Sequence, residues 1–393
     1  MKKPIAVVTI PTYNEAKTIG RTLEYLCEKT FPGITDYDMQ ILVFDDTSPD
    51  GTYKVVSEYE KKYKQVHLLI TGKTKGGIGA GYLKAFRHAI DNMGADFVFE
   101  FDSDLQHPPE TIPLLLAKMS QGYDYAIGSR KIKGGSNPAG WGFQRLFMSE
   151  VGGFVARMIM FFPFKYFFKV TDPTTGLKIT RVKGCLDKLD LDPEHLITKS
   201  FGYKLEMLYK TLQTGAKFTE IPLQFQIRKT DESKIDPQTA KEILLVAIKL
   251  RFFDPFTQKF LKFGTVGGLG FVVNIVGGHL FKALFAPAIP SVSLLNGISN
   301  TAAAELAIIS NFFWNNLWTF SKEKITLPSQ LVGKFITFNA SSAITGLVIP
   351  FVVITHLTVI FGDHFLIYQV IAIFGLTIPL NWFVYNHFIW KKK

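Results

Sequence analysis

The carboxyl-terminal 137 residues constrain the fold of this chain more than any other segment. Between Thr257 and Lys393 the sequence holds nine lysines, no arginine and only three acidic residues, and apolar side chains with Gly and Ala dominate the rest. A water-soluble domain cannot cover its surface with so few charged side chains. The sequence therefore predicts that this segment lies in a membrane.

Four apolar segments of this tail are long enough to cross a hydrocarbon core of ~30 Å. They are approximately Phe260–Phe285, Val292–Phe320, Leu331–Phe361 and Leu366–Trp390. The middle connection carries Lys322 and Lys324 and the chain ends in three lysines, whereas the other two connections lack Lys and Arg. The positive-inside rule then places the amino-terminal region, the middle connection and the carboxyl terminus in the cytosol. We expect an integral, multi-pass membrane protein, and we keep homo-oligomer formation through its membrane domain as an open hypothesis.

The first 256 residues have the pattern of a water-soluble α/β domain, in which short apolar runs alternate with helical stretches of about a dozen residues. The expected strands are Ile5–Ile10, Ile41–Phe44, His67–Thr71 and Phe97–Phe101, and the expected helices are Ala16–Lys29, Thr52–Tyr63 and Tyr82–Asn92. Ligands of such mostly parallel sheets bind beyond the carboxyl ends of the strands. Polar pairs follow all four strands here: Asn14/Glu15, Asp45/Asp46, Lys73/Lys75 and Asp102/Asp104.

Two stretches of this region, Phe147–Phe168 and Lys241–Phe256, mix aromatic, aliphatic and basic residues but are too short to span a bilayer. The pattern is typical of helices that lie in the headgroup plane, although ordinary amphipathic core helices would look the same. The predicted organisation is a cytosolic catalytic domain (1–235), an interfacial linker helix (236–256) and a four-span membrane domain (257–393).

The net charge of +11 does not indicate a nucleic-acid partner, because the positive charge lies beside and at the ends of apolar spans. Attraction to anionic lipid headgroups explains that placement better. The two cysteines, Cys27 and Cys185, match no metal-binding or redox spacing, which favours two reduced thiols.

Chemistry is most strongly indicated after the fourth strand, where Asp102 and Asp104 stand one residue apart and Gln106 follows. Hard divalent cations prefer oxygen ligands and are often shared with substrate phosphates. We therefore predict an Mn²⁺ or Mg²⁺ site at Asp102, Asp104 and Gln106, with the metal bridging to a diphosphate.

Together with these residues, P-T-Y-N-E after the first strand and D-D-T-S-P-D-G-T (45–52) after the second resemble the inverting family 2 glycosyltransferases of GT-A fold. The segment D-S-D-L-Q-H-P-P-E (102–110) most resembles dolichyl-phosphate (polyprenyl-phosphate) mannose synthases, whereas related glucosyltransferases more often have Asp at the position of His107. The resemblance covers about Ile5 to Lys234. The tail resembles GtrA-like four-helix membrane domains, through motifs around Phe260–Asn274 and Asn311–Phe320.

The resemblance implies a nucleotide-sugar donor, GDP-mannose, and a set of residues that hold it. Its members are Pro11, Tyr13, Glu15, Val43, Asp45, Lys75, Asp102, Ser103 and Asp104. Tyr13 offers a stacking face, and the Lys75 ammonium adds positive charge near the diphosphate. The glycines after Lys75 permit close approach of the backbone, although Gly76 stands where the family often has Leu.

The resemblance also implies a dolichyl or other polyprenyl phosphate as acceptor, whose phosphate needs cationic partners. The matching positions are Arg130, Arg145, Ser149, Arg228 and Lys234. Guanidinium groups pair bidentately with phosphate oxygens, and an anionic acceptor also explains why the sequence offers no convincing general base. Asp102, Asp104 and Arg130 are the expected catalytic residues. The D-P-T-T-G turn (172–176) is expected to shape the sugar pocket.

The expected reaction is the metal-dependent transfer of mannose, with inversion, to the lipid phosphate at the membrane surface. One alternative is a polyprenyl-phosphate glucosyl- or N-acetylhexosaminyltransferase that uses a UDP-sugar. A second, of another class, is a flippase or transporter of lipid-linked sugars with a non-catalytic transferase-like domain, which sparse intramembrane charge disfavours. A processive polysaccharide synthase is a third, but the sequence lacks a Q-x-x-R-W segment.

Overall fold

The computed structural model describes residues 2–227 and 237–391. The chain divides into two compact units, one up to Phe252 and one from Phe253 onward. After their predicted roles they are named the catalytic unit and the membrane unit. The boundary lies near the predicted start of the membrane domain, and the predicted linker corresponds largely to one helix, α9 (Pro237–Phe253).

The catalytic unit is built on a mixed sheet. Within the described residues it has seven strands in the order β3-β2-β1-β4-β6-β5-β7, and β6 alone runs antiparallel to its neighbours. The strands are β1 (Ile5–Thr12), β2 (Asp38–Asp45), β3 (Val66–Ile70), β4 (Phe97–Glu100), β5 (Tyr125–Ser129), β6 (Lys178–Arg181) and β7 (Phe218–Pro222). The predicted α/β domain with a mostly parallel sheet is confirmed, and all four expected strands are present.

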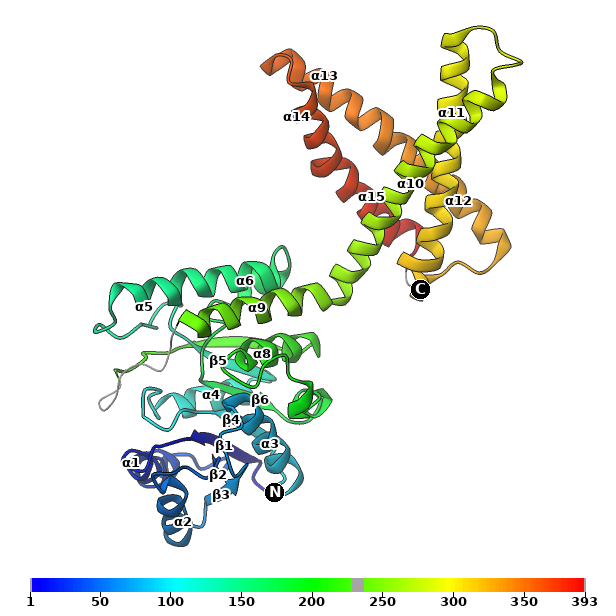
Figure 1. Cartoon of the computed structure of the whole chain (residues 1–393). Coiled ribbons are helices and arrows are strands. Elements are labelled where there is room, and N and C mark those ends of the chain that lie inside the picture. Colours follow the sequence, from blue (N-terminus) through cyan, green and yellow to red (C-terminus); the bar gives the residue numbers. More distant parts are fainter. Residues whose placement is uncertain (1, 228–236, 392–393) are drawn as a thin grey trace. The chain divides into compact units, whose positions relative to one another are not determined.

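Helices cover both faces of this sheet (Figure 1). They are α1 (Ile19–Tyr25), α2 (Thr52–Lys62), α3 (Ile78–Asp91), α4 (Thr111–Ser120), α5 (Phe143–Phe147), α6 (Gly153–Phe161), α7 (Lys165–Lys169) and α8 (Tyr203–Gln213). The expected helix over 16–29 begins later, at Ile19, and continues after Tyr25 as a π-helical turn to Thr30. The strands β1, β2 and β4 are almost wholly buried, because their aliphatic and aromatic side chains pack against helices on both sides.

The two basic-aromatic stretches form helices that pack on the catalytic unit along one face only. Ala156 and Phe161 of α6 lie in one core cluster with Val246 and Leu250 of α9. Large apolar side chains on the outer faces are exposed instead: Phe143, Phe147, Phe154 and Phe168, and Leu245, Ile248, Phe252 and Phe253. Exposed apolar surface of this extent marks an interaction site.

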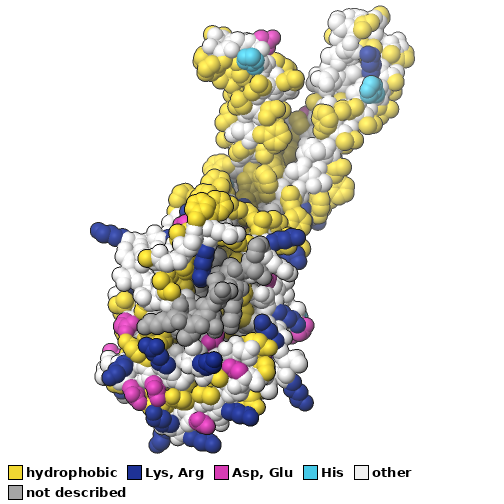
Figure 2. All heavy atoms as spheres, turned by 60° about the vertical axis from the view of Figure 1, so that its left-hand side comes forward, with side chains coloured by type: hydrophobic (Ala, Val, Ile, Leu, Met, Phe, Trp, Pro, Cys, Tyr) yellow, Lys and Arg dark blue, Asp and Glu magenta, His cyan; other side chains and the backbone are white. Residues whose placement is uncertain are grey.

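The membrane unit is all helical. Its described residues include four helices that are long and apolar enough to cross a membrane: Pro255–Phe285, Val292–Thr319, Pro328–Phe361 and Phe365–Ile389. These spans contain the labelled segments α10 (Pro255–Phe285), α11 (Val292–Trp314), α12 (Pro328–Ala343), α13 (Ile349–Phe361), α14 (Phe365–Val370) and α15 (Ile378–Val384). Hydrophobic side chains dominate the surface of these helices, whereas Lys, Arg, Asp and Glu are spread over the catalytic unit (Figure 2).

Aromatic packing joins the spans within the membrane unit. Phe312, Phe320, Phe338, Tyr385 and Trp390 form a buried cluster, and the Phe320 and Trp390 rings stack with centroids 4.5 Å apart. Small and aromatic residues can drive helix association in lipid through close packing, since burial of apolar surface gives no advantage there.

Candidate active site

A cavity of about 1100 Å³ opens at the carboxyl ends of β1, β2 and β4. One end is lined by the loops that follow these strands, including Tyr13, Lys75 and Asp104. The other end is lined by α5, α6 and the start of α9, including Val155 and Leu244. A polar end and an apolar end therefore belong to one continuous cleft.

The acidic motif follows β4 directly. Phe101 is buried and anchors the turn, while Asp102, Ser103, Asp104 and Gln106 line the cleft. Leu105 has a φ of 58°, so the backbone turns sharply between Asp104 and Gln106. The Gln106 backbone N–H donates to Asp104 Oδ1 at 3.1 Å, and the Gln106 side-chain amide donates to the Gln226 carbonyl at 3.1 Å. The structure thus brings the three expected metal ligands to one turn.

His107 fixes the orientation of Asp102. Its Nδ1 accepts a hydrogen bond from the Asp102 backbone N–H at 3.3 Å, which leaves the ring proton on Nε2, 3.5 Å from Asp102 Oδ2. Burial lowers the pKa of His107 to about 4 despite the neighbouring carboxylate, so the ring is neutral near pH 7. His107 therefore acts as a neutral hydrogen-bonding support for the acidic motif.

The donor set of this turn fits a hard divalent cation. Among the residues that the structure describes, no group of three or more His, Cys, Asp or Glu side chains gathers as a ready-made cage. Two carboxylates and an amide oxygen are what Mg²⁺ or Mn²⁺ takes from a protein when water and substrate phosphates complete its coordination.

Space beside Asp102 depends on Gly176. A methyl group at this position would lie 2.7 Å from Lys204 Nζ, 2.9 Å from His107 Cε1 and 3.2 Å from Asp102 Oδ2. The D-P-T-T-G turn therefore ends in glycine because any side chain there would crowd the acidic motif. Lys204, a buried residue of α8 that lines the same cleft, was not predicted from the sequence.

Apart from the acidic motif (Asp102, Ser103 and Asp104), the expected nucleotide-binding residues fall into two groups. Pro11, Tyr13, Glu15 and Lys75 line the cleft. The Lys75 ammonium lies 4.9 Å from the centre of the Tyr13 ring, a cation–π arrangement that brings the two loops together. Glu15 is buried, and its carboxylate accepts a hydrogen bond from the Thr18 hydroxyl at 2.7 Å.

Val43 and Asp45 form the second group and are fully buried within the sheet. Asp45 accepts hydrogen bonds from the Ser48 backbone N–H at 2.7 Å, from the Ser48 hydroxyl at 2.6 Å and from Thr12 Oγ1 at 2.8 Å. In this structure Asp45 braces the turn after β2. Its neighbour Asp46 lines the cleft and accepts from the Gly76 backbone N–H at 2.7 Å, which ties down the glycine-rich loop.

The expected acceptor residues lie at the ends of β5 and α5. Arg130 lines the cleft and pairs with Asp172, with Nε 2.6 Å from Oδ2 and Nη2 2.7 Å from Oδ1. Burial alone would raise the pKa of Asp172, but the charge and hydrogen bonds of Arg130 lower it below its ordinary value. The Arg145 guanidinium stacks 4.0 Å from the Trp141 ring centre, and Ser149 follows one helical turn later in the cleft wall. Arg228 and Lys234 lie outside the described residues.

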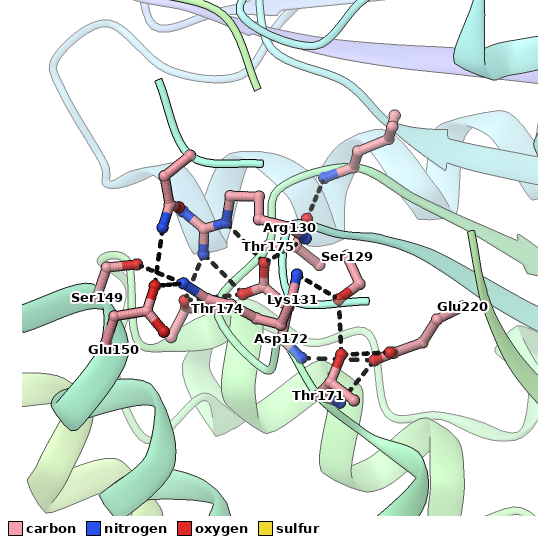
Figure 3. Close-up of polar contacts among 12 residues, drawn as sticks. Ser129, Arg130, Lys131, Ser149, Glu150, Thr171, Asp172, Thr174, Thr175 and Glu220 are labelled. Atoms are coloured by element: carbon pink, nitrogen blue, oxygen red, sulfur yellow. Dashed lines mark hydrogen bonds and ion pairs between the residues drawn. The ribbon is translucent and has the colours of Figure 1, made fainter. Parts of the chain in front are cut away.

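A second carboxylate, that of Glu220, organises this basic region through its contacts with Thr171 (Figure 3). Glu220 of β7 accepts a hydrogen bond from the Thr171 backbone N–H at 2.7 Å, and Thr171 Oγ1 lies 2.6 Å from Ser129 Oγ. Burial raises the pKa of Glu220 above its ordinary value although these hydrogen bonds oppose the shift. The network connects β5, β7 and the D-P-T-T-G turn, and so fixes where Arg130 and Asp172 meet.

Comparison with known proteins identifies the families to which the two parts of the chain are similar. Residues 7–183 match Glycosyl transferase family 2, and residues 262–390 match the GtrA/DPMS transmembrane domain. The dolichol-phosphate mannosyltransferase of Pyrococcus furiosus is 31% identical over 98% of this chain and 98% of its own length. The undecaprenyl-phosphate mannosyltransferase of Micrococcus luteus is 32% identical over 58% of this chain and 85% of its own length. The polyprenol monophosphomannose synthase of Mycolicibacterium smegmatis is 29% identical, with 61% and 83% covered.

The fold and these matches define a membrane-bound glycosyltransferase, which confirms the expected enzyme class. Both predicted domain families are present, in the predicted order along the chain. With a relative of this similarity along its whole length, the chain belongs to the dolichol-phosphate mannosyltransferase family.

Proposed function

We propose that this protein transfers mannose from GDP-mannose to a dolichyl-type polyprenyl phosphate, with inversion, to give a lipid-linked β-mannosyl phosphate. The observation that carries the proposal is the single cleft, in which an acidic motif at one end is continuous with arginines and an apolar helical wall at the other. The names of three relatives, all mannosyltransferases or a mannose synthase acting on polyprenol-type phosphates, support the same sugar and the same class of acceptor.

The donor occupies the strand-end side of the cleft in this proposal. Tyr13 and Glu15 contact the nucleoside, and Lys75 contributes positive charge to the diphosphate. Asp102, Asp104 and Gln106 would hold Mn²⁺ or Mg²⁺, which supplies charge stabilisation to the departing nucleoside diphosphate when bound. His107 keeps Asp102 in orientation, and Gly176 leaves room beside it.

The acceptor phosphate lies near Arg130, Arg145 and Ser149, with its prenyl chain along α5, α6 and α9. One phosphate oxygen attacks the anomeric carbon of mannose, the new carbon–oxygen bond forms, and the bond to the nucleoside diphosphate breaks. That oxygen is already ionised, so no proton has to be removed before attack. Catalysis then depends on positioning and on stabilisation of charge, for which preorganised cationic side chains are suited.

We also propose that the exposed aromatic faces of α5, α6 and α9 lie in the headgroup region, since aromatic and basic residues favour that environment. The catalytic unit and the carboxyl terminus are cytosolic in this proposal, because lysines mark the middle connection and the end of the chain.

A labelled-donor panel tests the proposed function. Full-length protein in lipid receives a polyprenyl phosphate and labelled GDP-mannose, UDP-glucose or UDP-N-acetylglucosamine, with Mn²⁺, Mg²⁺ or a chelator. We expect lipid-soluble label only from GDP-mannose and only with a divalent cation. Label only from a UDP-sugar would overturn the donor, and undiminished label with chelator would overturn the metal site.

A further inference from the structure

An ion pair that has no role in the proposed reaction lies beside the expected acceptor site. Lys131, the residue after Arg130, forms an ion pair with Glu150, the residue after Ser149 (Figure 3). The Lys131 ammonium also lies 3.4 Å from Ser149 Oγ, and Ser149 lines the cleft. The Lys131 ammonium therefore contacts a residue of the cavity wall.

Glu150 is held from a second side by an amide. The Asn137 side-chain N–H donates to Glu150 Oε1 at 2.8 Å, the same oxygen that Lys131 contacts. Partial burial raises the pKa of Glu150, but Lys131, Asn137 and the nearby Arg130 together lower it below its ordinary value. The carboxylate is therefore ionised at neutral pH.

The Lys131–Glu150 pair differs from the neighbouring Arg130–Asp172 pair in how easily another anion can replace its carboxylate. The Arg130 and Asp172 side chains are 10% and 1% exposed, and two short hydrogen bonds join them. The Lys131 and Glu150 side chains are 16% and 51% exposed. An ammonium group, unlike a guanidinium, has no planar set of N–H donors that matches both oxygens of a carboxylate. Because Glu150 is half exposed, water screens its attraction to Lys131, and another anion can replace it at small cost.

Substrate and product of the proposed reaction differ in the charge that would compete with Glu150. A polyprenyl phosphate is a monoester that carries close to two negative charges near pH 7, whereas its glycosylated product is a diester that carries one. The dianion can draw Lys131 away from Glu150 more strongly than the monoanion can. After transfer, Glu150 can recapture the ammonium group.

We propose that Lys131 is a further ligand of the acceptor phosphate, and that Glu150 is an internal competitor that holds Lys131 when no phosphate is bound and weakens retention of the phosphodiester product. This inference rests on the proposed function for the location of the acceptor, but it concerns the recognition of the phosphate rather than the choice of sugar. It assigns Lys131 to phosphate binding and Glu150 to product release.

Binding of two short probes to the full-length protein in detergent tests the proposal without any sugar transfer. Farnesyl phosphate is the monoester and methyl farnesyl phosphate is the diester, with affinities measured by calorimetry. We expect Lys131→Met to weaken farnesyl phosphate binding about tenfold, because one charged contact is lost. We expect Glu150→Gln to tighten it about twofold to fivefold and to tighten diester binding by no more than that, because the singly charged diester contacts Lys131 less strongly.

The double variant tests whether Glu150 acts by competing for Lys131 or by the repulsion of its own charge on the bound phosphate. If Glu150 acts by competing for Lys131, Lys131→Met/Glu150→Gln binds both probes as Lys131→Met does. Lys133→Met, which removes an exposed charge two residues away, is the matched control and should leave both affinities unchanged. Melting temperatures of all four variants identify any that fail to fold.

Three results would overturn the proposal. They are unchanged farnesyl phosphate affinity in Lys131→Met, weaker affinity in Glu150→Gln, or a Glu150→Gln effect that persists undiminished in the double variant. Failure of the proposed function is a different result, namely no transfer from GDP-mannose by a wild-type protein that still binds farnesyl phosphate.

Discussion

Replacement of Asp172 by Asn is expected to destabilise the catalytic unit strongly. The Asp172 carboxylate is 1% exposed and accepts three hydrogen bonds from Arg130: Nε at 2.6 Å, Nη2 at 2.7 Å and the backbone N–H at 3.1 Å. An amide keeps one acceptor oxygen but presents an N–H group to the guanidinium and removes the compensating charge. Neutralising one partner of a buried pair costs about 3–5 kcal/mol, and the 10% exposure of Arg130 favours the lower end, about 3 kcal/mol.

The assay is thermal unfolding of the full-length protein in detergent, followed through the catalytic unit. For a domain of this size about 3 kcal/mol corresponds to a decrease in melting temperature of about 6–12 °C. Because the pKa of Asp172 is lowered in the folded state, its stabilisation is complete above its unfolded-state pKa and is lost only as pH falls through the folded value. The difference between wild type and Asp172→Asn should therefore be constant from pH 6 to pH 8.

Two further variants test whether the loss of the Arg130–Asp172 pair causes this decrease. Thr174→Ala removes the 3.2 Å hydrogen bond from Arg130 Nη2 but keeps the carboxylate, so its melting temperature should fall by much less. Arg130→Gln combined with Asp172→Asn should be less destabilised than the sum of the single variants, because both remove the same pair. A melting temperature for Asp172→Asn within 2 °C of wild type would refute the reasoning.

Three further predictions concern the acidic motif. Asp104→Ala should lower mannosyl transfer at least about a hundredfold while membrane insertion is unchanged, because a charge-stabilising group is lost; near-normal transfer would refute its role. Because burial lowers the pKa of His107 to about 4, below an unfolded-state value of 6.5, the folded protein should lose stability as pH falls from 6.5 to 4. His107→Phe should lose less stability over that pH range in unfolding measurements. An equal loss would show that another group causes the pH dependence. Gly176→Ala should reduce transfer because its methyl group would lie 2.9 Å from Cε1 of the buried His107 ring, which supports Asp102; full activity would show that the ring shifts without consequence.

Much of the fold could be predicted from the sequence because its signals are local. The strands at 5–10, 41–44, 67–71 and 97–101 are apolar runs bounded by turn residues, and the four spans are apolar segments of bilayer length. The antiparallel β6 could not be predicted in this way. It is only four residues long, and its first residue is Lys178, which is fully buried 3.7 Å from Glu100 on the neighbouring strand.

The candidate site was predictable to the level of motifs but not of contacts. Asp45 and Asp46 both follow β2, and the sequence does not tell which side chain enters the sheet and which faces the cleft, because that depends on the exact register of the strand end. Lys204 carries no motif and reaches the site only through the placement of α8. Lys131 and Glu150 are 19 residues apart, and their contact depends on the path of the loop between β5 and α5.

For the D-P-T-T-G turn, residue types and spacing predict only that it shapes the sugar pocket. The structure assigns two separate physical tasks to it, since Asp172 holds Arg130 and Gly176 leaves space beside Asp102. Both depend on atoms that are far apart in the chain, which explains why residue types and spacing alone could not separate them.

The most direct test of the account is an experimental structure of the full-length protein with GDP, Mn²⁺ and farnesyl phosphate. We expect the metal and the diphosphate against Asp102, Asp104 and Gln106, and the farnesyl phosphate headgroup at Arg130, Arg145 and Ser149 in the same cleft. Nucleotide density away from the acidic turn, or a lipid phosphate outside that cleft, would contradict it.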